Sequence, residues 1–175
     1  MSKVEARFQF RNREVGRAQP RARFAGMLAA MAALCFSQWA TGQSAPRPEA
    51  LIKWRQSAYQ VIAWNSGRIK AALAGQYAPL EVQAAANALA GVANSGLATL
   101  FAAGTADGKG WRETTARDEV FSDAAKFRAL TEEFAREANT LARLAAAGDR
   151  ATVNEQFLKV AQACKACHEK FRQTD

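Results

Sequence analysis

The apolar residues of this chain recur at spacings of three and four from about residue 49 onward, as on one face of an amphipathic helix. Three such segments cover about 49–73, about 80–103 and about 119–147. A fourth follows Gly148 and Asp149, with an apolar stripe from Val153 to Phe171. Residues 104–118 form a long polar loop between the second and third segments, and no segment alternates as a strand would. The pattern predicts an all-α, antiparallel up-down four-helix bundle.

Large apolar side chains on these stripes are the expected core of the bundle. This predicted core consists of Trp54, Ile62, Phe127, Phe134, Phe157 and Phe171. Gly67 interrupts the first helix at a cost of about 1 kcal/mol relative to alanine, so we expect it to mark a close contact between helices.

Residues 1–42 have a different composition from the helical segments. A basic stretch extends to Arg23, an uncharged apolar run covers 24–40, and small residues follow at 40–42. This order predicts a cleaved secretory signal peptide at 1–42, a folded domain at 43–175 and a periplasmic location. The alternative is an uncleaved membrane anchor, which needs roughly 20 apolar residues, more than this run has. A lipoprotein site at Cys35 is disfavoured because the bulky Leu34 precedes it.

The net charge of the chain limits the classes of partner that it can bind. The whole chain has a net charge of +8, but 1–42 holds seven of the 24 basic and two of the 16 acidic residues. The remaining chain is therefore close to +3 and shows no basic stripe, which argues against a nucleic-acid partner. After cleavage of the signal peptide we expect no membrane association.

The sequence CKACHEKF, Cys164 to Phe171, contains the only histidine of the chain. A redox dithiol normally accompanies alternating strands and helices, and a structural zinc ion needs about four protein ligands. C-x-x-C-H is the signature for covalent haem attachment. On a helix, Cys164 and Cys167 share one face and His168 is turned about 100° further. The motif predicts one covalently bound haem c, with His168 on the iron.

The candidates for a second axial ligand of the iron can be reduced by elimination. Electron-transfer haems usually have two strong ligands, such as His/His or His/Met, but Met1, Met27 and Met31 all lie in the predicted signal peptide. Tyrosine or lysine, with solution pKa values near 10, would have to lose a proton, which costs roughly 4 kcal/mol at pH 7. The simplest interpretation is a five-coordinate, high-spin iron held by His168 alone and able to bind a small gas.

Two sequence stretches resemble one known family. CKACHEKFR near the C-terminus and KWRQSAYQVIAWNSGRIKA, Lys53 to Ala71, are similar to those of class II c-type cytochromes, most closely cytochrome c prime. The resemblance implies thioethers at Cys164 and Cys167 and a proximal ligand at His168. It also places Arg55 near a haem propionate, Tyr59 over the vacant distal face and Arg172 beside the proximal pocket. Arg55 and Tyr59 are four apart and therefore share a helix face.

The expected function is binding of nitric oxide or a similar gas, such as carbon monoxide, with a homodimer joined through the first two helices as the family implies. The rival class is an electron carrier, with a six-coordinate low-spin haem and a redox partner protein. A peroxidase or reductase would need distal acid–base groups, and the sequence identifies none near Tyr59. We therefore expect a binding protein and not an enzyme.

Overall fold

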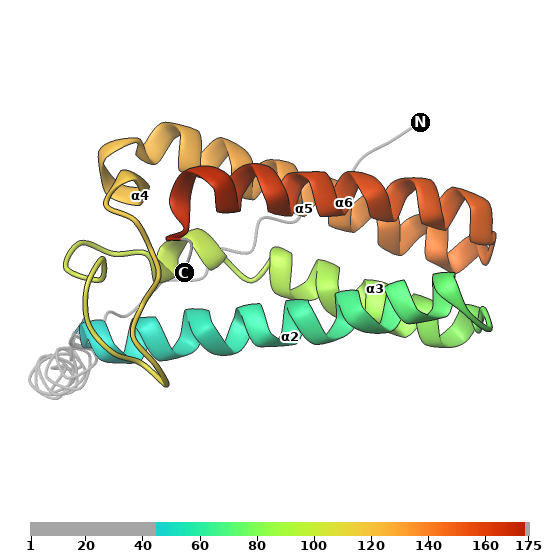
Figure 1. Cartoon of the computed structure of the whole chain (residues 1–175), viewed down its shortest axis with the longest axis horizontal. Coiled ribbons are helices and arrows are strands. Elements are labelled where there is room, and N and C mark those ends of the chain that lie inside the picture. The colour runs from blue at the N-terminus through green and yellow to red at the C-terminus, as the bar shows by residue number, and fades with distance from the viewer. Residues whose placement is uncertain (1–44, 174–175) are drawn as a thin grey trace, which may run out of the picture. The chain divides into compact units, whose positions relative to one another are not determined.

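Four long helices form the domain in residues 45–173, the part of the chain that the computed structural model describes. They are α2 (Pro48–Ala74), α3 (Pro79–Ala93), α5 (Ala124–Ala147) and α6 (Arg150–Phe171), with a 3₁₀ turn η1 (Leu97–Leu100) and a short α4 (Glu119–Ser122) between them. Figure 1 shows the long helices lying along the same axis, with successive ones running in opposite directions. The predicted four-helix bundle is confirmed, while the predicted signal peptide at 1–42 lies outside the described residues.

Gly148 and Asp149 form the turn between α5 and α6, as the sequence predicts. Gly148 ends α5 in the left-handed conformation, with φ of +78°, where a glycine has no steric penalty. Asp149 then caps α6, because its carboxylate accepts a hydrogen bond of 2.8 Å from the backbone N–H of Thr152. Proline at the first position of α2 and of α3 fits the helix start, where its missing N–H has no helical partner.

Two helix boundaries differ from the prediction. The second helix, expected to continue to about Ala103, ends at Ala93, because Gly96 adopts φ of +83° and the chain turns into η1. The third helix, expected to begin at Glu119, is broken at Asp123, which ends α4 and caps α5 by accepting from the N–H of Lys126 at 3.3 Å. Both breaks lie at the end of the bundle that the long loop covers.

The core is closed in the half of the bundle away from that loop. Each long helix supplies at least one fully buried aliphatic side chain there, namely Ile69, Leu89, Leu141 and Val153. α2 packs on α3, α3 on α5 and α5 on α6, whereas α2 and α6 do not pack closely along their length. The first and last helices therefore leave room between them near the loop.

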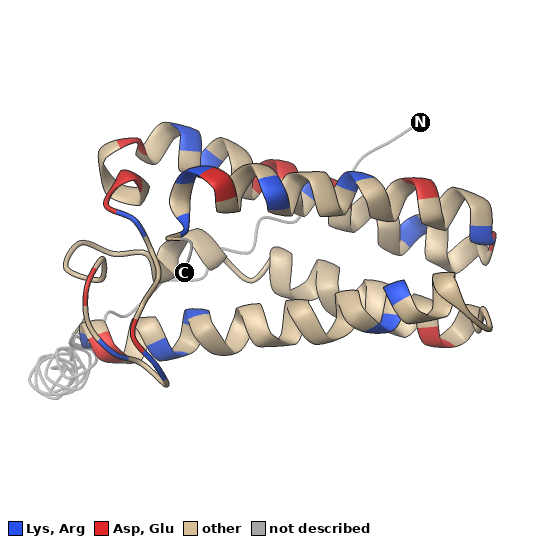
Figure 2. Ribbon diagram, viewed as in Figure 1, with Lys and Arg blue, Asp and Glu red and all other residues tan. Residues whose placement is uncertain are grey.

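The outward face of α2 carries exposed apolar residues. Trp54, predicted as core, is 52% exposed, so that prediction is wrong, while Ile62, Phe127, Phe134 and Phe171 are buried as predicted. Gly67 has no neighbour that a Cβ would meet, so the predicted close helix contact is also wrong. Figure 2 shows few charges along the middle of α2, and residues 56–67 include none. Within 45–173, no helix is long and apolar enough to cross a bilayer.

Candidate functional site

A cavity of about 480 Å³ lies between the N-terminal half of α2 and the C-terminal half of α6. Its volume falls in the range of roughly 300–1,000 Å³ typical of small-molecule and cofactor sites. A second, more open hollow of about 740 Å³ adjoins it, since Ser66, Cys164, His168 and Arg172 line both. All six predicted site residues line the 480 Å³ cavity: Arg55, Tyr59, Cys164, Cys167, His168 and Arg172.

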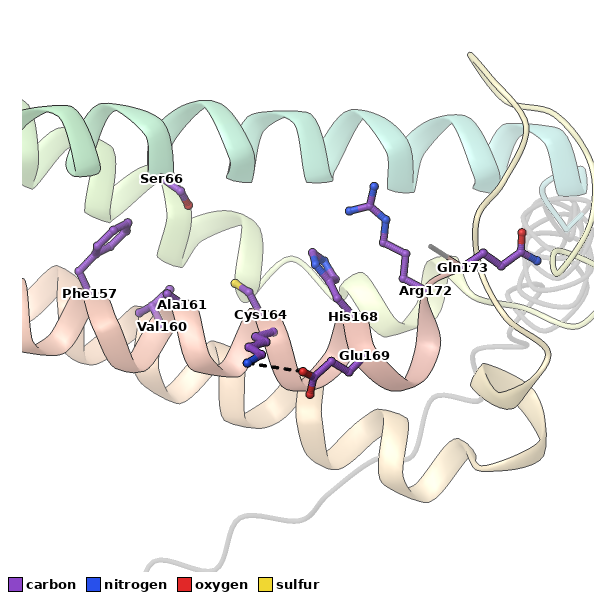
Figure 3. A pocket seen from close by; sticks show the side chains of 10 residues that line it. Ser66, Phe157, Val160, Ala161, Cys164, His168, Glu169, Arg172 and Gln173 are labelled. Carbon is purple, nitrogen blue, oxygen red and sulfur yellow. Dashed lines mark ion pairs between the residues drawn. The ribbon is translucent and has the colours of Figure 1, made fainter. Parts of the chain in front are cut away.

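The C-x-x-C-H residues lie on α6, and three of the predicted residues project toward α2. Figure 3 shows the side chains of Cys164, His168 and Arg172 pointing from α6 into the space below α2, with Ser66 pointing back from α2. The two cysteines are free thiols and are both partly buried. Helical spacing therefore presents two thiols and an imidazole to one cavity, as haem attachment requires.

The protonation states of these groups follow from burial. Burial raises the pKa of the Cys164 thiol, and burial together with the neighbouring Cys164 raises the pKa of Cys167 to about 11. Both cysteines are therefore thiols at neutral pH, unlike the low-pKa thiolate of a redox enzyme. Burial, with a smaller effect of the positive charge of Arg172, lowers the pKa of His168. Its imidazole is thus neutral at pH 7, which is the form that binds a metal.

Tyr59 faces the cavity from α2 and belongs to an aromatic wall. Its ring contacts Phe101 edge-on at 6.4 Å between centroids, Phe101 contacts Phe127 at 4.8 Å, and Phe127 contacts Phe171 at 5.3 Å. Burial, followed by the nearby Cys167 thiol, raises the pKa of the Tyr59 phenol well above its ordinary value. Tyr59 is therefore a neutral phenol, poorly suited to become an anionic metal ligand.

Arg55 is the buried charge of the site, with only 3% of its surface exposed. Its guanidinium donates to Thr105 Oγ1 at 2.8 Å, Thr105 O at 2.5 Å, Thr114 Oγ1 at 2.5 Å and Leu100 O at 3.5 Å. It also lies over the ring of Phe101, 4.7 Å from the centroid. All these acceptors are neutral, although a buried cation is normally matched by an anion. Burial accordingly lowers the pKa of Arg55.

The loop of residues 101–118, here called the strap, closes the cavity at this end. Beyond Arg55, it is tied to α2 by Gln56, whose Oε1 accepts from the backbone N–H of Trp111 at 2.7 Å. It is tied to α6 by two backbone bonds, Arg117 N–H to Phe171 O at 3.0 Å and Gln173 N–H to Thr115 O at 2.8 Å. The strap therefore joins the N-terminal half of α2 to the end of the helix that bears His168.

The residues around the cavity fit a haem. Apolar and aromatic side chains line most of its wall, two free thiols and a neutral imidazole project from α6, and a buried guanidinium faces only neutral acceptors. A flat apolar macrocycle with two carboxylates matches that combination of groups. By contrast, residues 45–173 contain no group of three His, Cys, Asp or Glu side chains arranged to hold a metal ion.

The sequence did not identify the strap threonines or Phe101 of the aromatic wall, whereas Tyr59, Phe127 and Phe171 were predicted as a site residue and two core residues. Thr105 and Thr114 meet Arg55 across 50 and 59 residues of chain, and no local pattern indicates such a distant contact. Phe101 was within the predicted second helix and joins the site only because that helix ends early. The signal available for these residues was weak, namely their position in an unusually long loop.

The fold and this site together define a class, the c-type haem proteins built on a four-helix bundle. The family model described as Cytochrome C' matches residues 50–172. The chain belongs to the cytochrome c' family, whose members carry covalently bound haem c.

Relatives and solved structures agree with that assignment. Cytochrome c' of Rhodocyclus tenuis is 51% identical over 130 residues, covering 74% of this chain and 98% of the relative. A solved cytochrome c', described as having an unusual ligand-controlled dimer dissociation, aligns with a TM-score of 0.72 and 40% identity over 75% of this chain and 100% of that one. A nitric oxide complex of a cytochrome c prime variant from Alcaligenes xylosoxidans aligns with a TM-score of 0.66 and 31% identity, covering 74% and 98%.

Proposed function

We propose that this protein binds nitric oxide, or a similar diatomic gas such as carbon monoxide, at a five-coordinate haem iron. In this proposal Cys164 and Cys167 would form the two thioethers and His168 would be the only protein ligand of the iron. The observation that carries it is the composition of the cavity wall, where the described residues contribute one imidazole and no methionine or lysine. When bound, haem c would supply an iron that can take up a diatomic gas.

The aromatic residues of the cavity wall favour a small neutral ligand. Tyr59, Phe101 and Phe127 supply bulky aromatic surface on the wall of the cavity. The neutral phenol of Tyr59 leaves the iron without a second protein ligand and crowds the approach to it. A ligand of two atoms needs little space, whereas a larger or strongly hydrated molecule would have to displace these side chains.

Arg55 and Arg172 are proposed to hold the haem by its edge and its proximal side. Arg55 is buried beside neutral acceptors, so a nearby propionate would supply the missing anionic partner by charge attraction. Arg172 lies one turn beyond His168 and lines both hollows. Its positive charge helps to keep His168 neutral and available to iron.

We further propose that the mature protein is periplasmic, released by cleavage near residue 42, and that it binds gas without turning it over. A homodimer through α2 fits the surface of that helix. Trp54, Val61 and Trp64 are 52%, 42% and 65% exposed, and spacings of seven and three place them near one another on the helix surface. Exposed apolar patches of this kind mark protein interfaces. Tyr59 lies on the same helix, so gas binding and dimer contact would share α2.

The test is an absorption titration of the purified, haem-loaded protein with nitric oxide. We expect high-spin bands in both the oxidised and the reduced protein, and a shift of the reduced spectrum that saturates at one gas molecule per haem. A low-spin spectrum that does not respond to nitric oxide would instead favour the electron carrier and reject the proposal.

A further inference from the structure

Arg55 makes more hydrogen bonds to the protein than it would need merely to pair its charge with a cofactor. The terminal nitrogens of the guanidinium make four hydrogen bonds, and every acceptor lies in η1 or the strap. Leu100 O is distant at 3.5 Å, so Thr105 and Thr114 supply the three short bonds. These bonds to the protein therefore fix the position of the Arg55 charge without any contribution from a carboxylate of the cofactor.

Both threonine hydroxyls are oriented to accept from Arg55. Thr105 is fully buried, and its hydroxyl donates its hydrogen to Ala102 O at 2.8 Å, which leaves its lone pairs for Arg55. Thr114 Oγ1 accepts from the backbone N–H of Ala116 at 3.2 Å as well as from Arg55, so both of its lone pairs are used. A valine at either position would fill the same volume, but its side chain could not accept the hydrogen bond that Arg55 donates to the hydroxyl. The bond from Arg55 to the main-chain oxygen of residue 105 would remain.

We propose that Thr105 and Thr114 are positioning residues, which hold the Arg55 guanidinium at the cavity wall and so fix its positive charge beside the haem. This inference rests on the proposed haem contact of Arg55. A cation held near the haem disfavours the oxidised iron, which carries one more positive charge than the reduced iron. The reduction potential should therefore depend on these two hydroxyls, although neither is proposed to touch the iron.

The other charged groups around the cavity differ from Arg55 in how they are held. Arg112, Glu113 and Arg172 line the same cavity but are exposed. Charges that remain in contact with water are screened far more than a buried one. Arg55 is therefore the charge to which the haem potential should respond most, and the threonines are the groups that keep it in position.

The experiment compares the midpoint potential of the haem-loaded protein with that of Thr105→Val, Thr114→Val and the matched serine variants. We expect both valine variants to have a lower potential than the wild type, and both serine variants to have the wild-type potential because serine keeps the hydroxyl. Arg55→Leu, which removes the charge without adding a possible iron ligand, sets the full size of the shift. Since Thr105 is fully buried, Thr114→Val provides the test if Thr105→Val does not fold.

Ser57→Ala is the control for loosening of the strap. It removes the hydroxyl that accepts from Trp111 Nε1 at 2.9 Å, another bond from α2 to the strap, without touching Arg55. A shift in Ser57→Ala as large as that in Thr114→Val would overturn the inference, as would unchanged potentials in both valine variants. Amide hydrogen exchange at Thr114, which donates to Gly108 O, should be faster in Thr114→Val than in Thr114→Ser.

The two proposals fail separately. If the wild-type protein is low-spin or does not bind nitric oxide, the proposed function is wrong, whatever the potentials of the variants. If the protein binds nitric oxide as expected and the valine variants keep the wild-type potential, only the role of the threonines is wrong.

Discussion

The two halves of the bundle are built from the same helices but are filled in different ways. Away from the strap, Ile69, Leu89, Leu141 and Val153 close the core with no exposed surface. Near the strap, the same helices surround a cavity of about 480 Å³ lined by Tyr59, His168 and the two free cysteines. One half therefore stabilises the fold with its own side chains, whereas the other is shaped around a group that the chain does not itself supply.

The buried polar groups of the two halves differ in kind. In the closed half the core is mostly aliphatic, and its buried amides, Asn65 and Gln156, donate hydrogen bonds to the main-chain oxygens of Val61 and Glu137. In the open half a buried arginine, two partly buried thiols and a neutral imidazole converge. A folding core gains nothing from that combination, because each polar group costs free energy when it is buried. The open half therefore holds the candidate site, and substitutions in each half test this division.

The largest effect is expected from removing both cysteines to which haem would be attached. In Cys164→Ala/Cys167→Ala, we expect no covalently bound haem, because no other thiol lies on the described cavity wall. Haem-dependent staining after denaturing electrophoresis measures this. Lys165→Ala, an exposed change between the two cysteines, should retain the full signal, and staining of the double variant would show that the thioethers are elsewhere.

A smaller effect is expected from truncation in the closed half. Leu141 is fully buried, and replacing a buried leucine by alanine typically costs 2–5 kcal/mol, so Leu141→Ala should lower the free energy of unfolding by about 3 kcal/mol. Leu130→Ala is the matched change in the open half, where the side chain is only partly buried on the cavity wall. Urea unfolding of the haem-loaded protein measures both. A larger loss at Leu130 would reverse the assignment of the two halves.

The smallest effect is expected on the rate of carbon monoxide binding. Tyr59→Ala should open the side of the cavity that faces His168 and speed carbon monoxide binding by about tenfold, which corresponds to a barrier lowered by about 1.4 kcal/mol. Flash photolysis measures the rate. Tyr77→Ala serves as the control, since Tyr77 packs on the core of the closed half and does not line the cavity. Equal rates in Tyr59→Ala and wild type would show that Tyr59 is not the crowding residue.

The sequence predicted the closed half of the fold better than the open half. Periodic apolar residues determine the four helices, and Gly148 with Asp149 determines the turn between the last two, because both signals are local. The end of α3 was predicted about ten residues too late, since its alanine-rich sequence suits a helix and the break is made by the C-cap Asn94 and the left-handed Gly96. Trp54 was assigned to the core because periodicity alone does not distinguish the core face from an apolar outer face.

The candidate site was predictable where the chemistry is encoded by residues close in sequence. Cys164, Cys167 and His168 form one motif, and Arg55 and Tyr59 share one face of α2. The structure adds that all of them line a single cavity. It also adds Thr105 and Thr114, whose contacts with Arg55 span 50 and 59 residues. Contacts of that kind depend on how the strap folds back over α2, which no local pattern determines.

We propose that the open half offers the iron one protein ligand, His168. Electron paramagnetic resonance of the oxidised, haem-loaded protein tests this ligation, because the signal reports the spin state and therefore the number of strong ligands on the iron. A high-spin ferric signal is expected at neutral pH, as iron with one strong axial ligand gives. A purely low-spin signal would show a second strong protein ligand, and His168 would then not hold the iron alone.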